Sequence, residues 1–161
     1  MNKNTKPIFN KKLLEVAIKK NVGAAIEEDL KKNDKTSDIL PIKTKGVAKI
    51  QAKQNAILCG SPWVNYCFRQ IDKNIRIIWH FNEGSKIKKG DEICTILGNY
   101  NGILKGERIA INFLQTLSGT ATTSNLMNLK INKYKAKLFD TRKTIPGLRV
   151  AQKYAVQLGG A

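Results

Sequence analysis

The hydrophobic period of this sequence changes twice, and this change limits the folds that the chain can adopt. Apolar residues between 13 and 18 recur at helical spacing after Asn10, which can cap a helix, and a second helical segment is predicted over residues 22–30. From Val47 the period is two, and it is clearest over residues 75–81. The alternating residues on one face are Ala48, Ile50 and Ala52 in the first run and Ile75, Ile77, Trp79 and Phe81 in the second. This part of the chain therefore predicts helices packed against an antiparallel sheet, an α+β arrangement.

The spacing becomes helical again near Gly106. We expect the pair Ser118-Gly119 to bend or interrupt this helix, and the run "AKLF" at 136–139 to form a short buried strand. A last helix over 150–158 ends at Gly159-Gly160. The order helix, strand, turn, helix is the start of an α/β domain. Because a lone strand leaves backbone N–H and C=O groups without partners, we expect the chain beyond residue 105 to be loose and sensitive to proteases.

The net charge of +17 raises the question of an anionic partner. The chain has 24 Lys against 5 Arg, together with 15 Asn, and the lysines are spread along it. This profile favours compositional bias over a surface for nucleic acid, which would show clustered basic residues with aromatic residues among them. The few arginines are therefore more informative than the lysines.

The cysteines and the one histidine do not indicate a reactive site. Cys59, Cys67 and Cys94 lie in apolar stretches without a CxxC pair, so we expect buried free thiols. His80 should be exposed or partly packed rather than catalytic, because its strand position puts it opposite Trp79 and Phe81. No apolar run of about 18 residues and no signal-peptide pattern occurs, so we expect a cytoplasmic protein without a membrane partner.

The stretch "FDTRKTIPGLR" places Arg142, Lys143 and Arg149 around a turn that contains Thr144, Pro146 and Gly147. It follows the expected strand and precedes a helix, and α/β folds place ligand sites at that position. Backbone N–H groups and a threonine hydroxyl can hold an anion there, with the helix N-terminus adding positive potential. The pattern alone leaves two interpretations open, an anion-binding loop and a solvated cationic loop.

The same stretch carries a family resemblance. "DTRKTIPGLR" followed by "KYAVQLGG" resembles the signature of quinolinate phosphoribosyltransferase, the carboxylating nicotinate-nucleotide pyrophosphorylase. The similarity continues through "ERIAINFLQTLSGTAT", "GSKIKKGDEICTILG" and "EEDLKKNDKTSDIL". Gln152 stands where the family usually has an acidic residue, and the chain ends before the family's Asn-His-Arg segment. We therefore expect a truncated chain without activity of its own; whether it is a fragment, a decayed gene product or the full protein stays open.

The resemblance implies two domains, an α+β domain over residues 1–109 and the start of an α/β barrel over residues 110–161. It implies transfer of the phosphoribosyl group of phosphoribosyl pyrophosphate to quinolinate with loss of CO2 and pyrophosphate, giving nicotinate mononucleotide with the help of Mg²⁺. By the family pattern, quinolinate is bound by Thr141, Arg142 and Lys143, and by Arg108 from the partner subunit of a homodimer. It assigns no catalytic residue and no metal ligand within this chain.

Three other interpretations are open at this point. A phosphoribosyltransferase of the same fold could use another acceptor. A basic nucleic-acid-binding domain would use the positive charge. A carrier domain is suggested by the Gly-punctuated hairpin "GSKIKKGDEICTILG", although the Met-Lys-Met site for a cofactor is missing.

Overall fold

A computed structural model gives the structure of the protein and describes residues 10–30 and 44–161. Most of the segment "EEDLKKNDKTSDIL" therefore lies outside the described residues. The chain opens with one helix, α1 (Lys11–Leu30). Asn10 caps it as expected, because its side-chain Oδ1 accepts a hydrogen bond from the Lys12 N–H at 2.9 Å. The prediction of two helical segments was wrong, since α1 is continuous through residues 18–22.

The expected antiparallel sheet is confirmed. Its three strands lie in the order β1 (Lys45–Gln51), β5 (Glu92–Asn99) and β3 (Arg76–Trp79). Along β1 the side chains alternate between exposed and half-buried, as the period of two predicts. A second, two-stranded sheet pairs β2 (Ala56–Ile57) with β4 (Lys86–Ile87).

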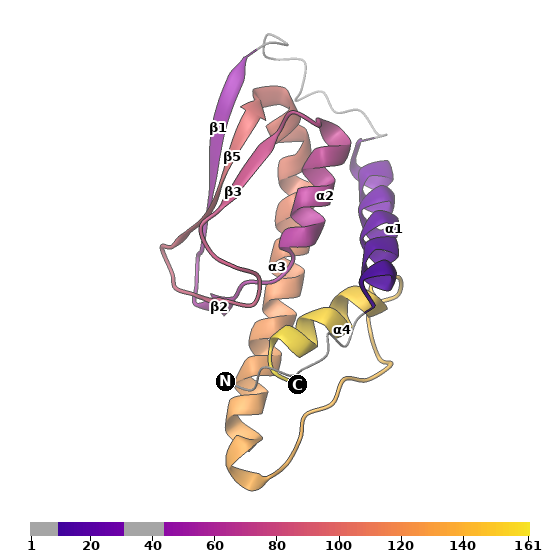
Figure 1. Ribbon diagram of the computed structural model, residues 1–161, viewed down its shortest axis with the longest axis vertical. Coiled ribbons are helices and arrows are strands. Elements are labelled where there is room, and N and C mark those ends of the chain that lie inside the picture. The colour runs from indigo at the N-terminus through magenta and orange to yellow at the C-terminus, as the bar shows by residue number, and fades with distance from the viewer. Residues whose placement is uncertain (1–9, 31–43) are drawn as a thin grey trace.

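Two helices cover the inner face of the larger sheet (Figure 1). They are α2 (Ser61–Ile71) and α3 (Tyr100–Ile131), and their buried side chains form one core with the strands. The helix α3 begins six residues before Gly106 and is not interrupted at Ser118-Gly119, against expectation. The Ser118 hydroxyl hydrogen-bonds the backbone N–H and C=O of Cys59, both at 3.0 Å, so this polar side chain is satisfied inside the core.

A second core joins all four helices. α1 lies on the side of α2 and α3 away from the sheet, and α4 (Arg149–Leu158) crosses the lower part of α3 (Figure 1). Ala151 and Ala155 of α4 are fully buried, and the ring of Tyr154 lies 5.5 Å from that of Trp63, measured between centroids. The expectation of a loose chain beyond residue 105 was therefore wrong: α3 and α4 complete this core.

The expected strand at 136–139 does not form. After α3 the chain makes a short 3-10 turn, η2 (Asn132–Tyr134), and then runs irregularly to α4 on the side of α3 away from the large sheet (Figure 1). Phe139 is 76% exposed. A strand needs a neighbouring strand to pair its backbone groups, and the two described sheets contain none for this segment. Among the described residues, no helix is long and apolar enough to cross a membrane.

Candidate anion-binding loop

The cationic loop is the first part of the candidate site. Thr141, Arg142 and Lys143 are exposed and consecutive, and local hydrogen bonds shape their backbone. The Thr141 hydroxyl accepts from the Lys143 N–H at 3.1 Å, and the Arg142 carbonyl accepts from the Thr144 N–H at 3.1 Å. None of the ion pairs found in residues 10–30 and 44–161 involves Arg142 or Lys143. Both cations are therefore presented to solvent, where an anion can reach them.

A tight turn then joins this loop to α4. The Leu148 N–H donates to the Ile145 carbonyl at 3.0 Å across Pro146 and Gly147. Gly147 has φ of +80°, which is the backbone angle of the third residue of a type II turn and favours glycine. The Gln152 side chain on α4 accepts from the Ile145 N–H at 2.7 Å. The Pro146-Gly147 pair thus makes the turn that the sequence predicted, directly before a helix N-terminus.

Two further contacts tie the loop to α4. The Arg149 guanidinium donates to the Arg142 carbonyl at 3.4 Å, so the backbone of Arg142 lies close to the first turn of α4. Asp140 forms an ion pair with Lys153 at 2.9 Å, and both side chains are about 30% exposed. Positive potential at the start of a helix favours an anion beside this loop.

Arg108, the fourth expected residue, lies elsewhere in the chain. It projects from α3 with 77% of its side chain exposed, and its Nη1 lies 3.9 Å from Asp29 Oδ1 near the C-terminal end of α1. The loop instead contacts α1 at Asn21. Asp29 lies eight positions beyond Asn21 along the helix, which corresponds to a rise of about 12 Å. The structure therefore brings Thr141, Arg142 and Lys143 together within one chain and leaves Arg108 on another part of the surface.

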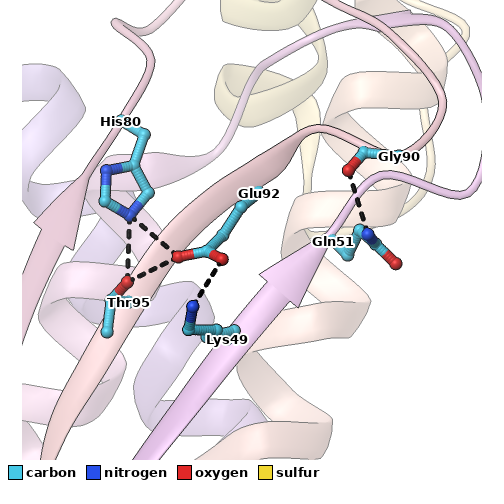
Figure 2. Close-up of polar contacts among 6 residues, drawn as sticks. All are labelled: Lys49, Gln51, His80, Gly90, Glu92 and Thr95. Atoms are coloured by element: carbon cyan, nitrogen blue, oxygen red, sulfur yellow. Dashed lines mark hydrogen bonds and ion pairs between the residues drawn. The ribbon is translucent and has the colours of Figure 1, made fainter.

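A second polar cluster lies on the outer face of the large sheet (Figure 2). His80 Nε2 is 2.9 Å from the Thr95 hydroxyl and 3.3 Å from Glu92 Oε1, and Lys49 Nζ is 2.8 Å from Glu92 Oε2. The hydrogen bond from Lys49, with that from Thr95, holds the pKa of Glu92 below its usual range. His80 is exposed, as expected, and belongs to this network of the sheet rather than to the loop.

Neither the cysteines nor the acidic side chains of the described residues supply a reactive thiolate or a metal site. All three cysteines are buried and free, as expected. Burial raises the pKa of Cys67 to about 12 and that of Cys94 to about 11, so neither supplies a thiolate at neutral pH. In the part of the chain that the structure describes, no three His, Cys, Asp or Glu side chains are grouped to hold a metal ion. These residues therefore do not fit a Mg²⁺ site, which prefers oxygen ligands in octahedral geometry.

Two domain models of one protein family match most of the chain. Residues 34–118 match the model of the quinolinate phosphoribosyl transferase N-terminal domain, and residues 120–161 match that of the C-terminal domain. The chain belongs to the quinolinate phosphoribosyl transferase family. The two matched regions meet within α3, which is continuous there.

Individual family members agree in sequence and in fold. The chain is 35% identical over 136 residues to a probable carboxylating nicotinate-nucleotide pyrophosphorylase of Synechocystis, covering 84% of this chain and 46% of the relative. A mitochondrial quinolinate phosphoribosyltransferase of Nicotiana tabacum is 34% identical over 75% of this chain and 34% of its own length. The solved nicotinate-nucleotide pyrophosphorylase of Francisella tularensis superposes with a TM-score of 0.90 at 39% identity, over 98% of this chain and 55% of that chain. The chain thus spans about half the length, or less, of these family members.

Sequence reasoning missed one residue that touches the candidate site. Asn21 on α1 donates a hydrogen bond to the carbonyl of Gly147. The available signal was a polar residue between Ile18 and Val22 on the apolar face of the first helix. Such a residue is expected to have a hydrogen-bond partner, but the pattern alone does not identify a partner 126 residues away.

Proposed function

We propose that the protein takes part in the phosphoribosyl transfer of its family, in which quinolinate and phosphoribosyl pyrophosphate give nicotinate mononucleotide, CO2 and pyrophosphate. One observation carries this proposal: the signature residues Thr141, Arg142 and Lys143 lie together on an exposed loop beside the start of α4. Family membership makes quinolinate the expected anion. A phosphoribosyltransferase with another acceptor is the alternative that this proposal must exclude.

The chemistry of quinolinate suits such a loop. Its two neighbouring carboxylates require several cations at fixed positions. Arg142 offers a planar fork that can bind a carboxylate through two hydrogen bonds, and Lys143 offers a compact charge. When the ring nitrogen attacks the ribosyl carbon, pyrophosphate leaves and the nitrogen becomes cationic. That charge helps the bond between C2 and its carboxylate to break, and C2 then takes up a proton.

We propose that Arg108 completes the quinolinate site from the partner subunit of a homodimer. The Arg108 guanidinium is exposed, and it lies beside Asp29 of α1, whereas the loop contacts α1 at Asn21. Both observations support a role in another subunit. The division into domains at residues 109 and 110 and a cytoplasmic location stay predictions, and the tobacco relative is named as mitochondrial. For Mg²⁺, which the resemblance implies, the described residues offer no ligand set, so we assign it no step.

The proposal is tested by quinolinate binding, measured by isothermal titration calorimetry. Arg142→Ala should weaken binding roughly ten- to hundredfold, because a charge-assisted hydrogen bond contributes about 1.5–3 kcal/mol. Arg108→Ala should weaken it too, although Arg108 is remote from the loop in its own chain. Arg76→Ala removes the same charge from the exposed face of β3 and should leave the affinity unchanged.

Two results would contradict the proposal. Equal affinity of the protein and the Arg142→Ala variant would remove the loop from the site. Equal binding of quinolinate and the mono-acid nicotinate would favour another acceptor, because a site built for two carboxylates should discriminate against one. Unchanged binding by Arg108→Ala alone would contradict only the shared site of the dimer.

A further inference from the structure

Asn21 is a buried polar residue that connects the helical core to the candidate loop. Its side chain is on α1, between Ile18 and Val22 of the four-helix core, and the residue is 8% exposed. Its Oδ1 accepts a hydrogen bond from Trp63 Nε1 at 3.2 Å, and its Nδ2 donates to the Gly147 carbonyl at 2.9 Å. Both ends of the amide are therefore paired, as the burial of a polar group requires.

The two partners determine which way the amide points. The indole N–H of Trp63 can only donate, and the backbone carbonyl of Gly147 can only accept. The oxygen of Asn21 must therefore face Trp63, and its nitrogen must face Gly147. Leucine, alanine and serine lack either the second polar atom or the reach, and aspartate would place an acceptor against an acceptor at Gly147. The position specifically suits a side-chain amide.

The carbonyl that Asn21 holds belongs to the turn that sets the direction of the chain between the loop and α4. Gly147 is the positive-φ residue of the turn that leads from Lys143 into α4. The other hydrogen bonds described above for this loop are local, joining residues between Asp140 and Lys153. The bond from Asn21 instead comes from a helix at the opposite end of the sequence.

Packing around the loop is incomplete on two sides. A hollow of about 430 Å³ separates the turn from α1, and Asn21 and Gly147 both line it. A second hollow of about 580 Å³ lies where residues 138–141 face α3 and Val156 of α4. The loop therefore borders open space on these two sides, and the hydrogen bond from Asn21 ties its turn directly to the helical core against which Leu148 also packs.

We infer that Asn21 is a positioning residue, which holds the Thr-Arg-Lys loop in place through the Gly147 carbonyl. The anchoring does not depend on what the loop binds; its consequence for quinolinate rests on the proposed function. Trp63 in turn holds Asn21 by a hydrogen bond. The loop is therefore connected through Asn21 to a fully buried residue of the helical core.

The test compares Asn21→Leu, which has the same branched arrangement of side-chain heavy atoms and no polar atoms, with Asn21→Asp, which keeps the acceptor for Trp63. Limited proteolysis with trypsin, followed by mass spectrometry, measures cleavage after Arg142 and Lys143. Cleavage after Arg69, within α2, reports global unfolding in the same sample. Both variants should raise loop cleavage roughly tenfold relative to cleavage at Arg69, as expected when one hydrogen bond that closes a segment is lost.

A matched control is available in the second Trp–Asn pair of the protein. Trp79 Nε1 donates to Asn65 Oδ1 at 2.9 Å, but this hydrogen bond is exposed and is not connected to the loop. Asn65→Leu should leave loop cleavage unchanged. For Asn21→Asp, lowering the pH until the new carboxyl is protonated restores a donor toward Gly147, so loop protection should return; Asn21→Leu should show no such recovery.

Several outcomes would overturn the inference. Unchanged loop cleavage in a folded Asn21→Leu variant would do so, and so would an equal rise at Arg69, which would make Asn21 a residue of core stability only. If Asn21→Asp does not fold, Asn21→Leu and the control still decide the question. A loosened loop together with no quinolinate binding by the unmodified protein would uphold the anchoring and contradict the proposed function instead.

Discussion

Two apolar runs of this chain, residues 75–81 and 136–139, have the composition of a strand, yet only the first contains one. β3 lies against β5, pairing Arg76 with Leu97 and Trp79 with Cys94, and it turns Ile77 toward the core. The second run lies beside no described strand and leaves Phe139 largely exposed. An apolar run is therefore sufficient for a strand only where a neighbour supplies the ladder.

The two segments also differ in what stabilises them. The strands are held by backbone pairing and by a continuous core, and they support the helices. The segment before α4 is held by side chains that reach its backbone, such as Gln152 and Asn21. A loop presented by a rigid scaffold in this way is the usual setting for a binding site. The difference separates the part of the molecule that carries stability from the part that carries recognition.

The largest effect should come from the central strand. Ile96 on β5 is 2% exposed, and Ile96→Ala should lower the free energy of unfolding by roughly 2–5 kcal/mol, since it removes buried methyl groups and leaves a cavity. Phe139→Ala, which deletes a larger side chain, should change it by less than about 0.5 kcal/mol. Urea denaturation followed by circular dichroism measures both. Similar losses for the two variants would break the comparison.

An intermediate effect should appear where the chain packs again after the loop. A Cβ at Gly159 would lie 2.4 Å from the Ala121 carbonyl oxygen, so Gly159→Ala must push α4 away from α3. We expect it to destabilise the protein by about 1–3 kcal/mol, the usual cost of overpacking. The measurement is the urea midpoint at constant slope.

Gly119→Ala is the matched control for this prediction. A Cβ there meets nothing within 4 Å, and the residue lies inside α3. Alanine should leave stability unchanged or raise it by up to about 1 kcal/mol, because glycine is a poor helix residue. If Gly159→Ala were equally harmless, α4 would not be packed as described.

The smallest effect should come from the exposed face of the sheet. The pKa of Glu92 is lowered in the folded protein, mainly by the hydrogen bond from Lys49, so the carboxylate stabilises the fold above the ordinary pKa of a glutamate. This contribution is lost as the pH falls through the lowered pKa. Glu92→Gln should therefore reduce the loss of stability at acidic pH, measured as urea midpoints over a series of pH values. Parallel pH profiles for the two proteins would exclude a role for this network.

Much of the fold could be predicted because its signals are local. The alternation along residues 75–81 and the spacing from Val150 to Leu158 depend on neighbouring residues alone, and both elements form. The turn before α4 was predictable for the same reason, since Pro146 and Gly147 carry their backbone preferences with them. The cationic residues of the signature could also be predicted from the sequence, because they are consecutive residues of one short loop.

Other features depend on residues far away in the sequence. Whether residues 136–139 form a strand depends on a pairing neighbour. The partner of the buried Ser118 hydroxyl is likewise the backbone of a distant residue, Cys59. The expected separation of a stable part and a loose part failed for this reason, since α4 packs on helices formed much earlier in the chain.

Composition and periodicity were thus enough to predict the start of α1, the helix α4, the antiparallel strands, the turn and the charge of the loop, but they did not predict α2. The three-dimensional fold alone established that α3 is continuous, that Arg108 lies apart from Arg142 and that Asn21 reaches Gly147. The physical reason is that backbone preference and hydrophobic period act within a few residues. Hydrogen bonds and packing between distant segments exist only once the chain has folded and brought those segments together.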